Sequence, residues 1–251
     1  KLPVSRSLYL NQLLKGIKGT EIVKNQEYKK IVNKLNQEQL EEEYELPKTL
    51  NAKLRYYQKT GYTWLKILDN YKFGGILADD MGLGKTIQIL AIILNYIEET
   101  KKEKTESTNK KETENKEEAE NKNTYNTEKQ KERKTSIVIS PSSLTLNWLN
   151  EAQKFAPNLQ VKVISGKASE RKEQIENLEK YDIIITSYDL LKRDIEAYKQ
   201  KAYTFKFAIT DEAQYLKNSN TQNAKAVKQI KAQTKNRGCL KCKKIKTKTT
   251  R

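Results

Sequence analysis

The chain of 251 residues is long enough for one α/β domain of ordinary size with appendages. Its 49 Lys and Arg against 32 Asp and Glu give a net charge of +17, which favours a polyanionic partner, nucleic acid first and an acidic membrane surface second. The absence of histidine excludes Ser/His/Asp and Cys/His catalysis and every His-containing metal site. Two cysteines exclude a disulfide framework and favour a reducing compartment.

The positive charge is concentrated near the C-terminal end of the sequence. Residues 225–251 contain 11 basic and no acidic residues, so the first 224 residues hold 38 basic and 32 acidic ones, a net charge of only +6. The argument for nucleic acid is therefore weaker for the body of the chain. No run of eighteen apolar residues and no charged-then-apolar leader occurs, so the sequence predicts neither membrane insertion nor secretion, and we expect a cytoplasmic protein.

Residues 1–47 are predicted to form a helical leader, because apolar residues recur at helical spacing; a loosely held solvated extension is the alternative. A second helix is predicted over residues 54–68. Its core-facing stripe consists of Leu54, Tyr57, Gly61, Trp64, Leu65 and Leu68. Gln58 interrupts this pattern with an amide that both donates and accepts, which suits the edge of an adenine. A glutamine considered alone is more often a surface residue of a helix. Contact of Gln58 with an adenine is favoured only because Gln58 lies upstream of the loop that follows.

That loop dominates the sequence. Residues 76–78 are predicted to form a short strand, and a helix is expected to open at Lys85 and Thr86 after a glycine-rich turn. Gly82 and Gly84 allow the backbone to bend and to approach a ligand closely, and the start of the helix favours an anion. The pattern G-x-x-x-x-G-K-[ST] is matched except at its first glycine. Lys85 is therefore expected to reach the β/γ-phosphates of ATP, and the Thr86 hydroxyl to ligate Mg²⁺; a chance match is the alternative.

Composition changes sharply after an apolar helix predicted over residues 87–97. Residues 98–135 form an insertion of balanced charge with few apolar residues. Such a segment cannot bury enough apolar surface to offset the chain entropy lost on folding. It is therefore predicted to be disordered or a fraying helix.

The remaining pattern predicts a doubly wound parallel sheet of the α/β class. Strands are expected over residues 136–140, 161–165, 182–187 and 205–210, and helices over residues 144–155, 169–178 and 188–203. Ser142 or Ser143 is the expected cap of the first of these helices. Asp211 and Glu212 follow the last strand, where a carboxylate faces the crevice in which open α/β sheets bind ligands. With the phosphate loop, Asp211 would hold the Mg²⁺ shell and Glu212 would orient or deprotonate the attacking water.

These blocks, in this order, resemble the first RecA-like lobe of the Swi/Snf family of ATP-dependent DNA translocases, within the superfamily-two helicases. The stretch around Gln58 is similar to the family's adenine-reading block, although a proline is common where Tyr56 stands. The stretch from Asp79 to Thr86 is similar to its phosphate loop, in which Asp79 replaces the first glycine. Asp211-Glu212-Ala213-Gln214 is similar to its block for Mg²⁺ and water. The match covers roughly residues 50–233 outside the insertion, and a lobe over residues 48–233 is predicted.

The resemblance implies a P-loop ATP hydrolase that uses ATP and Mg²⁺. The residues that match the nucleotide-binding blocks are Gln58, Asp80, Met81, Gly82, Leu83, Gly84, Lys85 and Thr86, with Lys85, Asp211 and Glu212 as the catalytic set. Two further blocks resemble those that touch the DNA backbone, and their candidates are Ser140, Pro141, Ser142, Ser187 and Tyr188. The implied partner is double-stranded DNA, with RNA polymerase or other nucleoid proteins as candidate partners, no membrane and no small-molecule acceptor.

Residues 234–251 depart from the family's pattern, which continues with a coupling block and a second RecA-like lobe. We expect a basic tail there, of the kind that a truncated or frame-shifted product would carry. Cys239 and Cys242 could be half of a zinc site, but an incidental pair is favoured because no second pair exists. The alternatives to a motor lobe are a hydrolysis-dead fragment that binds nucleotide and DNA, and another P-loop phosphotransferase.

Overall fold

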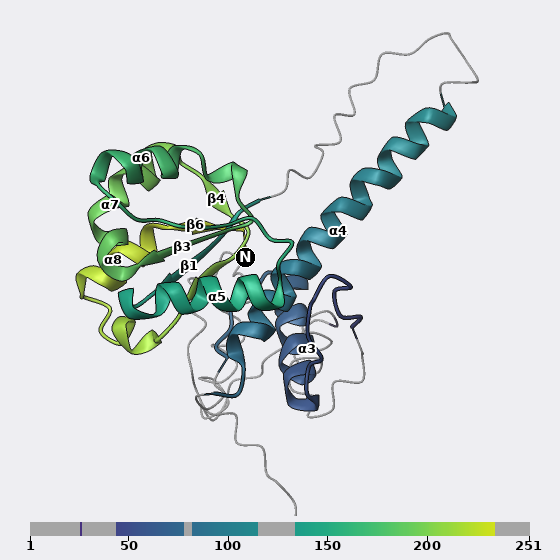
Figure 1. Cartoon of the computed structure of the whole chain (residues 1–251), viewed down its shortest axis with the longest axis horizontal. Coiled ribbons are helices and arrows are strands. Elements are labelled where there is room, and N and C mark those ends of the chain that lie inside the picture. Colours follow the sequence, from purple (N-terminus) through teal and green to yellow (C-terminus); the bar gives the residue numbers. More distant parts are fainter. Residues whose placement is uncertain (1–25, 27–43, 78–81, 115–133, 234–251) are drawn as a thin grey trace, which may run out of the picture.

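Four parallel strands form the central sheet, in the order β2-β3-β1-β5. Figure 1 shows the sheet among the helices that pack around it. The computed structural model describes residue 26 and residues 44–77, 82–114 and 134–233, and the predicted basic tail and nearly all of the leader lie outside these residues. The strands of the main sheet are β1 (Ser136–Ser140), β2 (Val161–Val163), β3 (Ile183–Ser187) and β5 (Ala208–Thr210). A second, two-stranded parallel sheet consists of β4 (Thr204–Phe205) and β6 (Lys231–Ala232).

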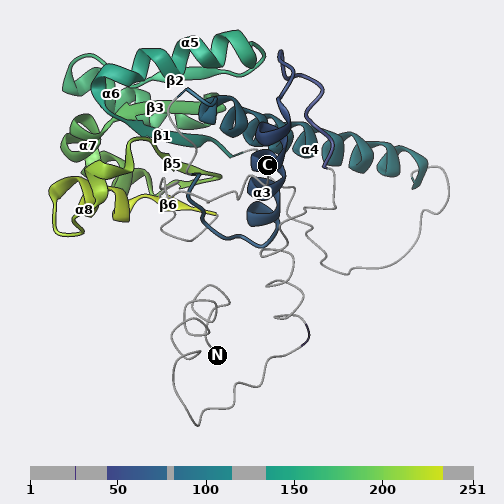
Figure 2. The same ribbon diagram turned by 90° about the horizontal axis from the view of Figure 1, so that it is seen from below.

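Helices cover both faces of the main sheet. They are α3 (Tyr56–Asn70), α4 (Lys85–Glu114), α5 (Thr145–Phe155), α6 (Ala168–Glu176), α7 (Tyr188–Lys201) and α8 (Gln222–Gln229). Three 3₁₀ turns connect them, η1 (Ser142–Leu144), η2 (Leu178–Lys180) and η3 (Ala213–Leu216). Figure 2 shows α3 and α4 on the opposite side of the sheet from α7 and α8. The doubly wound α/β fold predicted from the sequence is therefore present.

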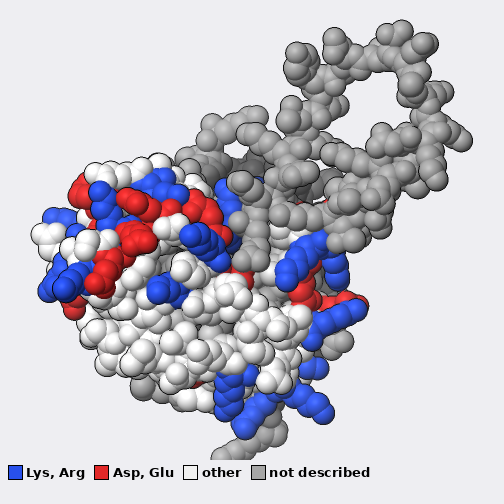
Figure 3. Space-filling model, turned by 45° about the horizontal axis from the view of Figure 1, so that its top comes forward, with Lys and Arg blue, Asp and Glu red and all other residues white. Residues whose placement is uncertain are grey.

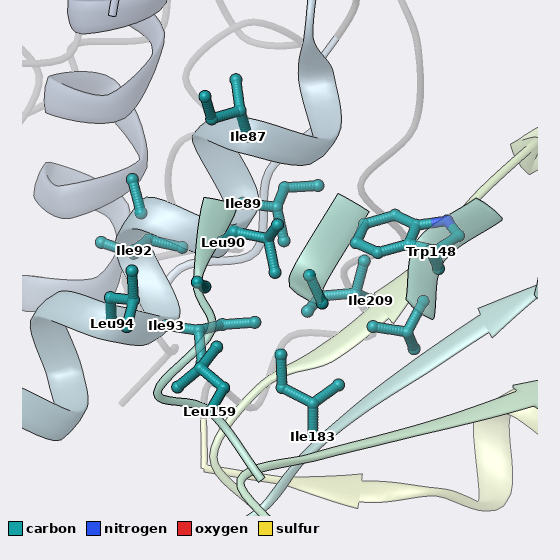
Figure 4. Packing of buried hydrophobic residues seen from close by; sticks show 14 of the residues in the cluster. Ile87, Ile89, Leu90, Ile92, Ile93, Leu94, Trp148, Leu159, Ile183 and Ile209 are labelled. Carbon is teal, nitrogen blue, oxygen red and sulfur yellow. The ribbon is translucent and has the colours of Figure 1, made fainter. Parts of the chain in front are cut away.

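The alternation of side chains along the strands explains the two-sided arrangement. Val138 of β1 lies in a core shared with α3, α4 and α5, whereas its neighbours Ile137 and Ile139 lie in a second core shared with α6, α7 and α8. Ile184 of β3 lies in the second core in the same way. Because successive side chains of a strand point to opposite faces, each apolar strand supplies both cores. Figure 4 shows the first core, in which the isoleucines of α4 meet Trp148 and Ile209.

Helices α3 and α4 pack closely because one residue of α3 has no side chain. A Cβ added to Gly61 would lie 1.9 Å from Oε1 of Gln88, a fully buried residue of α4. The core-facing stripe predicted for α3 is correct at Leu65 and Leu68 but wrong at Tyr57, which is 37% exposed. Tyr62 takes its place in the core, with its hydroxyl donating to the carbonyl of Glu45 at 2.9 Å.

The insertion, predicted to be disordered or a fraying helix, is helical at its start and ends in an ordered approach to β1. Helix α4 continues to Glu114, and residues 134–135 already lead into β1. Glu98 accepts hydrogen bonds from the backbone of Lys48 and from the backbone and hydroxyl of Thr49, at 2.7 to 3.1 Å. Glu99 forms an ion pair with Lys66 at 2.5 Å. These contacts with α3 and the segment before it hold the helix beyond the last isoleucine, and residues 115–133 lie outside the described part of the chain.

Three smaller predictions also need correction. Residues 76–77 are not assigned to a strand; the segment before the loop packs on α3, where a Cβ on Gly75 would lie within 2.5 Å of Trp64 and Leu68. The strand predicted over residues 205–210 divides, because β4 pairs with β6 while β5 pairs with β1. No serine side chain caps α5, which instead continues from the 3₁₀ turn η1.

The charge on the surface is mixed rather than continuous. On the face in Figure 3, Lys and Arg lie among Asp and Glu at the upper left, the middle is largely uncharged, and further charged residues, mostly basic, lie along the right and lower edges. This agrees with the modest net charge of the sequence before the basic tail. Within the described residues, no helix is long and apolar enough to span a membrane.

Candidate nucleotide-binding site

The described part of the phosphate loop, from Gly82 onward, has the backbone that its glycines predict. Gly82 and Gly84 have φ values of +83° and +76°, a region that residues with a Cβ adopt only at a cost. Helix α4 begins at Lys85, directly after the second glycine. The first turn of a helix directs backbone N–H groups and the positive end of its dipole toward the preceding loop, which favours a bound anion. Asp80 and Met81, also predicted to bind nucleotide, lie outside the described residues.

Gln58 joins α3 to the phosphate loop. Its Nε2 donates to the carbonyl of Leu83 at 3.0 Å, and its Oε1 accepts from the backbone N–H of Arg55 at 2.9 Å. A Cβ on Gly84 would lie 2.5 Å from the same Nε2, so glycine is needed there for this contact as well as for its φ. The side chain therefore supports the loop directly. Contact with adenine stays a prediction, and it would require this amide to share or exchange one of the two hydrogen bonds.

The acidic pair stands at the end of β5, as expected. The backbone N–H of Asp211 donates to the carbonyl of Ile139 at 2.9 Å, which continues the pairing of β5 with β1. Glu212 has a φ of +50°, in the left-handed region that residues other than glycine rarely adopt. Its backbone N–H donates to Oδ1 of Asp211 at 2.9 Å. Strained backbone of this kind persists only where the surroundings enforce it, and it often marks functional sites.

One pocket of about 240 Å³ brings the two halves of the site together. Lys85 and Thr86 come from the start of α4, whereas Asp211 and Glu212 come from the end of β5. Among the described residues the lining is Leu77, Gly82, Gly84, Lys85, Thr86, Ile89, Asn147, Trp148, Glu151, Ile209, Thr210, Asp211 and Glu212. One basic side chain, two threonine hydroxyls and three carboxylates thus line a space next to an anion-favouring helix start.

Helix α5 contributes three pocket residues that the sequence prediction did not assign to the nucleotide site. Asn147 and Glu151 are one turn apart and form a hydrogen bond at 3.4 Å, and Trp148 donates from Nε1 to Oδ2 of Asp211 at 2.9 Å. The position of this helix in the chain could have indicated its role. A helix that follows β1 begins at the carboxyl edge of the sheet, where ligands bind in this fold class.

Three of the five candidates for contact with DNA have buried side chains in this structure, and their contact with DNA stays a prediction. Ser140 is fully buried, and Ser187 caps α7 by accepting from the backbone N–H of Leu190 at 3.2 Å. Tyr188 is 3% exposed, and its hydroxyl donates to the carbonyl of Asp211 at 2.7 Å. The strand-end positions were correct, but the polar atoms serve the fold. Pro141 is half-buried and Ser142 is exposed, so these two stay candidates.

Comparisons with known proteins decide the family. The model of the SNF2-related domain matches residues 57–242, which is most of the chain and extends past residue 233, the predicted end of the lobe. The chain belongs to the Swi2/Snf2 family of ATPases. The ATPase core of the Sulfolobus solfataricus SWI2/SNF2 protein, solved in complex with double-stranded DNA, is similar with a TM-score of 0.56 and 35% identity over 76% of this chain. The RecA-like α/β fold predicted from the sequence is thereby confirmed.

Curated relatives agree with this assignment. The TATA-binding protein-associated factor MOT1 of Saccharomyces cerevisiae is 36% identical over 191 residues, or 75% of this chain. An ATP-dependent helicase of Mycoplasma genitalium is 36% identical over 178 residues, or 71% of this chain. The chain spans 9% and 14% of these two relatives and 32% of the Sulfolobus chain. The Swi2/Snf2 sequence is thus that of an ATPase core region, much shorter than these proteins.

Proposed function

We propose that this Swi2/Snf2 chain binds ATP·Mg²⁺ in the pocket between the start of α4 and the end of β5. The observation that carries the proposal is the single pocket that Lys85, Thr86, Asp211 and Glu212 line together. In it, Lys85 would attract the β/γ-phosphates, and backbone N–H groups of the loop and of α4 would bind their oxygens. Glu212 would orient or deprotonate the attacking water.

The oxygen donors at the pocket fit a magnesium ion. Thr86 supplies a hydroxyl and Asp211 a carboxylate, both of them the hard oxygen ligands that Mg²⁺ prefers. No group of three or more His, Cys, Asp or Glu side chains that could hold a metal occurs within the described residues. Mg²⁺ commonly keeps several waters and binds through one or two protein ligands plus phosphate oxygens, so this sparse set is sufficient. The ion would neutralise charge on the phosphates when bound.

Family membership extends the proposal to a motor function. We infer that the chain is one lobe of an ATP-dependent translocase in which hydrolysis drives movement along duplex DNA. The complex of the Sulfolobus core with double-stranded DNA supports DNA as the partner. The exposed Ser142 and the half-buried Pro141, at the carboxyl end of β1, are the remaining backbone-contact candidates. RNA polymerase or other nucleoid proteins as partners, and a nucleoid-associated cytoplasmic location, stay predictions.

The 251-residue chain by itself is expected to hydrolyse ATP very slowly. Of the described residues that line the pocket, Lys85 alone is basic. Charge that develops on the transferred phosphoryl group also needs a positive partner, and an arginine in that role contributes about 10³–10⁵ in rate in other P-loop enzymes. In this family the resemblance implies that a second lobe supplies it. Phosphate release, measured with and without duplex DNA, should be close to that of the Glu212→Gln variant; robust DNA-stimulated release would show a complete enzyme.

Nucleotide binding is tested by Lys85→Ala. This variant should bind a fluorescent ATP analogue with Mg²⁺ much more weakly than the parent, because it removes the basic side chain from the pocket. Its thermal stability should be nearly unchanged, since Lys85 is the half-exposed first residue of α4 and lies outside both cores. Lys172→Ala on the exposed face of α6 is the matched control and should bind like the parent. Equal affinity in Lys85→Ala and the parent would contradict the proposed site.

A further inference from the structure

The carboxylate of Asp211 is held at both of its oxygens. Oδ2 accepts from Nε1 of Trp148 at 2.9 Å, and Oδ1 accepts from the backbone N–H of Glu212 at 2.9 Å. Two hydrogen bonds on different oxygens define the plane of the carboxylate. Each carboxylate oxygen can accept at more than one position, so both keep acceptor capacity toward the pocket that Asp211 lines. Asp211 is therefore oriented by the protein while still able to bind a cation.

Trp148 is itself rigidly placed. It is 4% exposed, and its ring packs in the first core. Figure 4 shows the ring beside Ile209, with the indole nitrogen turned away from the isoleucines of α4. An indole N–H is a donor only, so it needs an acceptor, and a carboxylate makes the stronger charge-assisted bond. A donor fixed by core packing gives Asp211 a fixed partner.

Tyr188 contacts residues on both sides of the strained Glu212. Its hydroxyl donates to the carbonyl of Asp211 at 2.7 Å, just before Glu212. Its ring stacks on Tyr215 of η3, three residues after Glu212, with centroids 5.2 Å apart and planes 10° apart. The left-handed conformation of Glu212 thus lies between two attachments to one buried side chain. These contacts supply the enforcement that such a conformation requires.

We propose that Trp148 and Tyr188 are positioning residues that hold Asp211 and Glu212 in the geometry needed for a divalent cation and water. This inference rests on the proposed binding of ATP·Mg²⁺ in the same pocket. Trp148 belongs to α5 and Tyr188 to α7, the helices that follow β1 and β3. Movement of either helix start would therefore move Asp211. Tyr188, a candidate for contact with DNA in the sequence analysis, thus contacts the acidic pair in this structure.

The test separates metal-dependent binding from metal-independent binding. Affinity for a fluorescent ATP analogue is measured by titration of the 251-residue chain with Mg²⁺ and with EDTA. Trp148→Phe keeps an aromatic ring but removes the N–H that donates to Asp211. Loss of such a hydrogen-bond partner of a metal ligand typically lowers metal affinity by on the order of tenfold or more. We expect affinity with Mg²⁺ to fall by about tenfold while affinity with EDTA is unchanged. Tyr188→Phe, which keeps the stacked ring, should change affinity in the same direction by a smaller factor.

Matched controls distinguish positioning from general damage. Trp64→Phe on α3 removes an indole outside the pocket lining, and Tyr203→Phe removes a hydroxyl that accepts from the backbone N–H of Thr135 at 2.9 Å. Both should bind nucleotide like the parent in either condition. An equal loss of affinity with Mg²⁺ and with EDTA, or no loss in Trp148→Phe and Tyr188→Phe, would overturn the inference while leaving the proposed function in place. If Trp148→Phe does not fold, the comparison of Tyr188→Phe with Tyr203→Phe decides the inference. If the parent chain binds no nucleotide, both this inference and the proposed function are overturned.

Discussion

Because the backbone at Glu212 is left-handed, we predict that a residue with a Cβ at this position lowers the free energy of unfolding. With its φ of +50°, a residue that has a Cβ loses roughly 1–2 kcal/mol relative to the right-handed conformation. Glycine avoids that steric cost. The backbone contacts of residue 212, from its N–H to Asp211 and from Tyr215 to its carbonyl, do not involve its side chain. Glu212→Gly should therefore retain them and relieve the strain.

The size of the effect follows from two opposing terms. Relief of the left-handed conformation gains roughly 1–2 kcal/mol, whereas the larger freedom of glycine in the unfolded chain costs about 0.5–1 kcal/mol. The free energy of unfolding should thus rise by up to about 1.5 kcal/mol, with a middle value a little below 1 kcal/mol. For a domain of this size, 1 kcal/mol corresponds to a melting temperature about 2–4 °C higher. The same change removes the carboxylate proposed to activate water, so stability rises where function is lost.

Urea unfolding followed by tryptophan fluorescence measures the difference. Glu212→Ala is the essential comparison, because it also removes the carboxylate but keeps a Cβ and hence the strain; it should show no gain. Lys72→Gly, at a φ of +55° outside the pocket lining, should show a similar gain with nucleotide affinity unchanged. If Glu212→Gly is less stable than Glu212→Ala, the strain argument for this residue is wrong.

Three further predictions test the packing around the site. Gly61→Ala should destabilise the lobe by about 1–3 kcal/mol, because the added Cβ would clash with the buried side chain of Gln88. Adding Gln88→Ala to this variant should restore part of the lost stability, because it removes the side chain that clashes. Burial alone would raise the pKa of Glu98, but hydrogen bonds from Thr49 and Lys48 outweigh burial and lower the pKa. The free energy of unfolding should therefore fall as the pH drops below about 4.5, because protonation of Glu98 weakens these bonds. Glu98→Gln should reduce this pH dependence. Replacing residues 115–131 by a short Gly/Ser linker should leave the melting temperature and nucleotide affinity nearly unchanged, whereas a large drop in melting temperature would show that the segment packs on the lobe.

Local sequence determined the parts of this protein that depend on neighbouring residues alone. Glycines at 82 and 84 followed by Lys85 fixed a turn and a helix start, because the backbone angles and the helix dipole are local properties. Runs of β-branched residues fixed the buried strands, and the acidic pair was placed correctly at the end of the last one. These blocks, in order, were also sufficient to predict the Swi2/Snf2 family, which the comparisons confirm.

Only the tertiary structure decided which polar groups face the site and which serve the fold. Ser187 and Tyr188 carry hydroxyls at the end of β3. From the sequence alone, these hydroxyls could equally contact a ligand, cap a helix or form a buried hydrogen bond, and in the structure they do the last two. The first charged residues of α4 are anchored by partners that lie far away in the chain, such as Thr49 for Glu98. The bond from Trp148 to Asp211 joins residues 63 positions apart. Such contacts arise from packing between distant elements, so no local pattern specifies them.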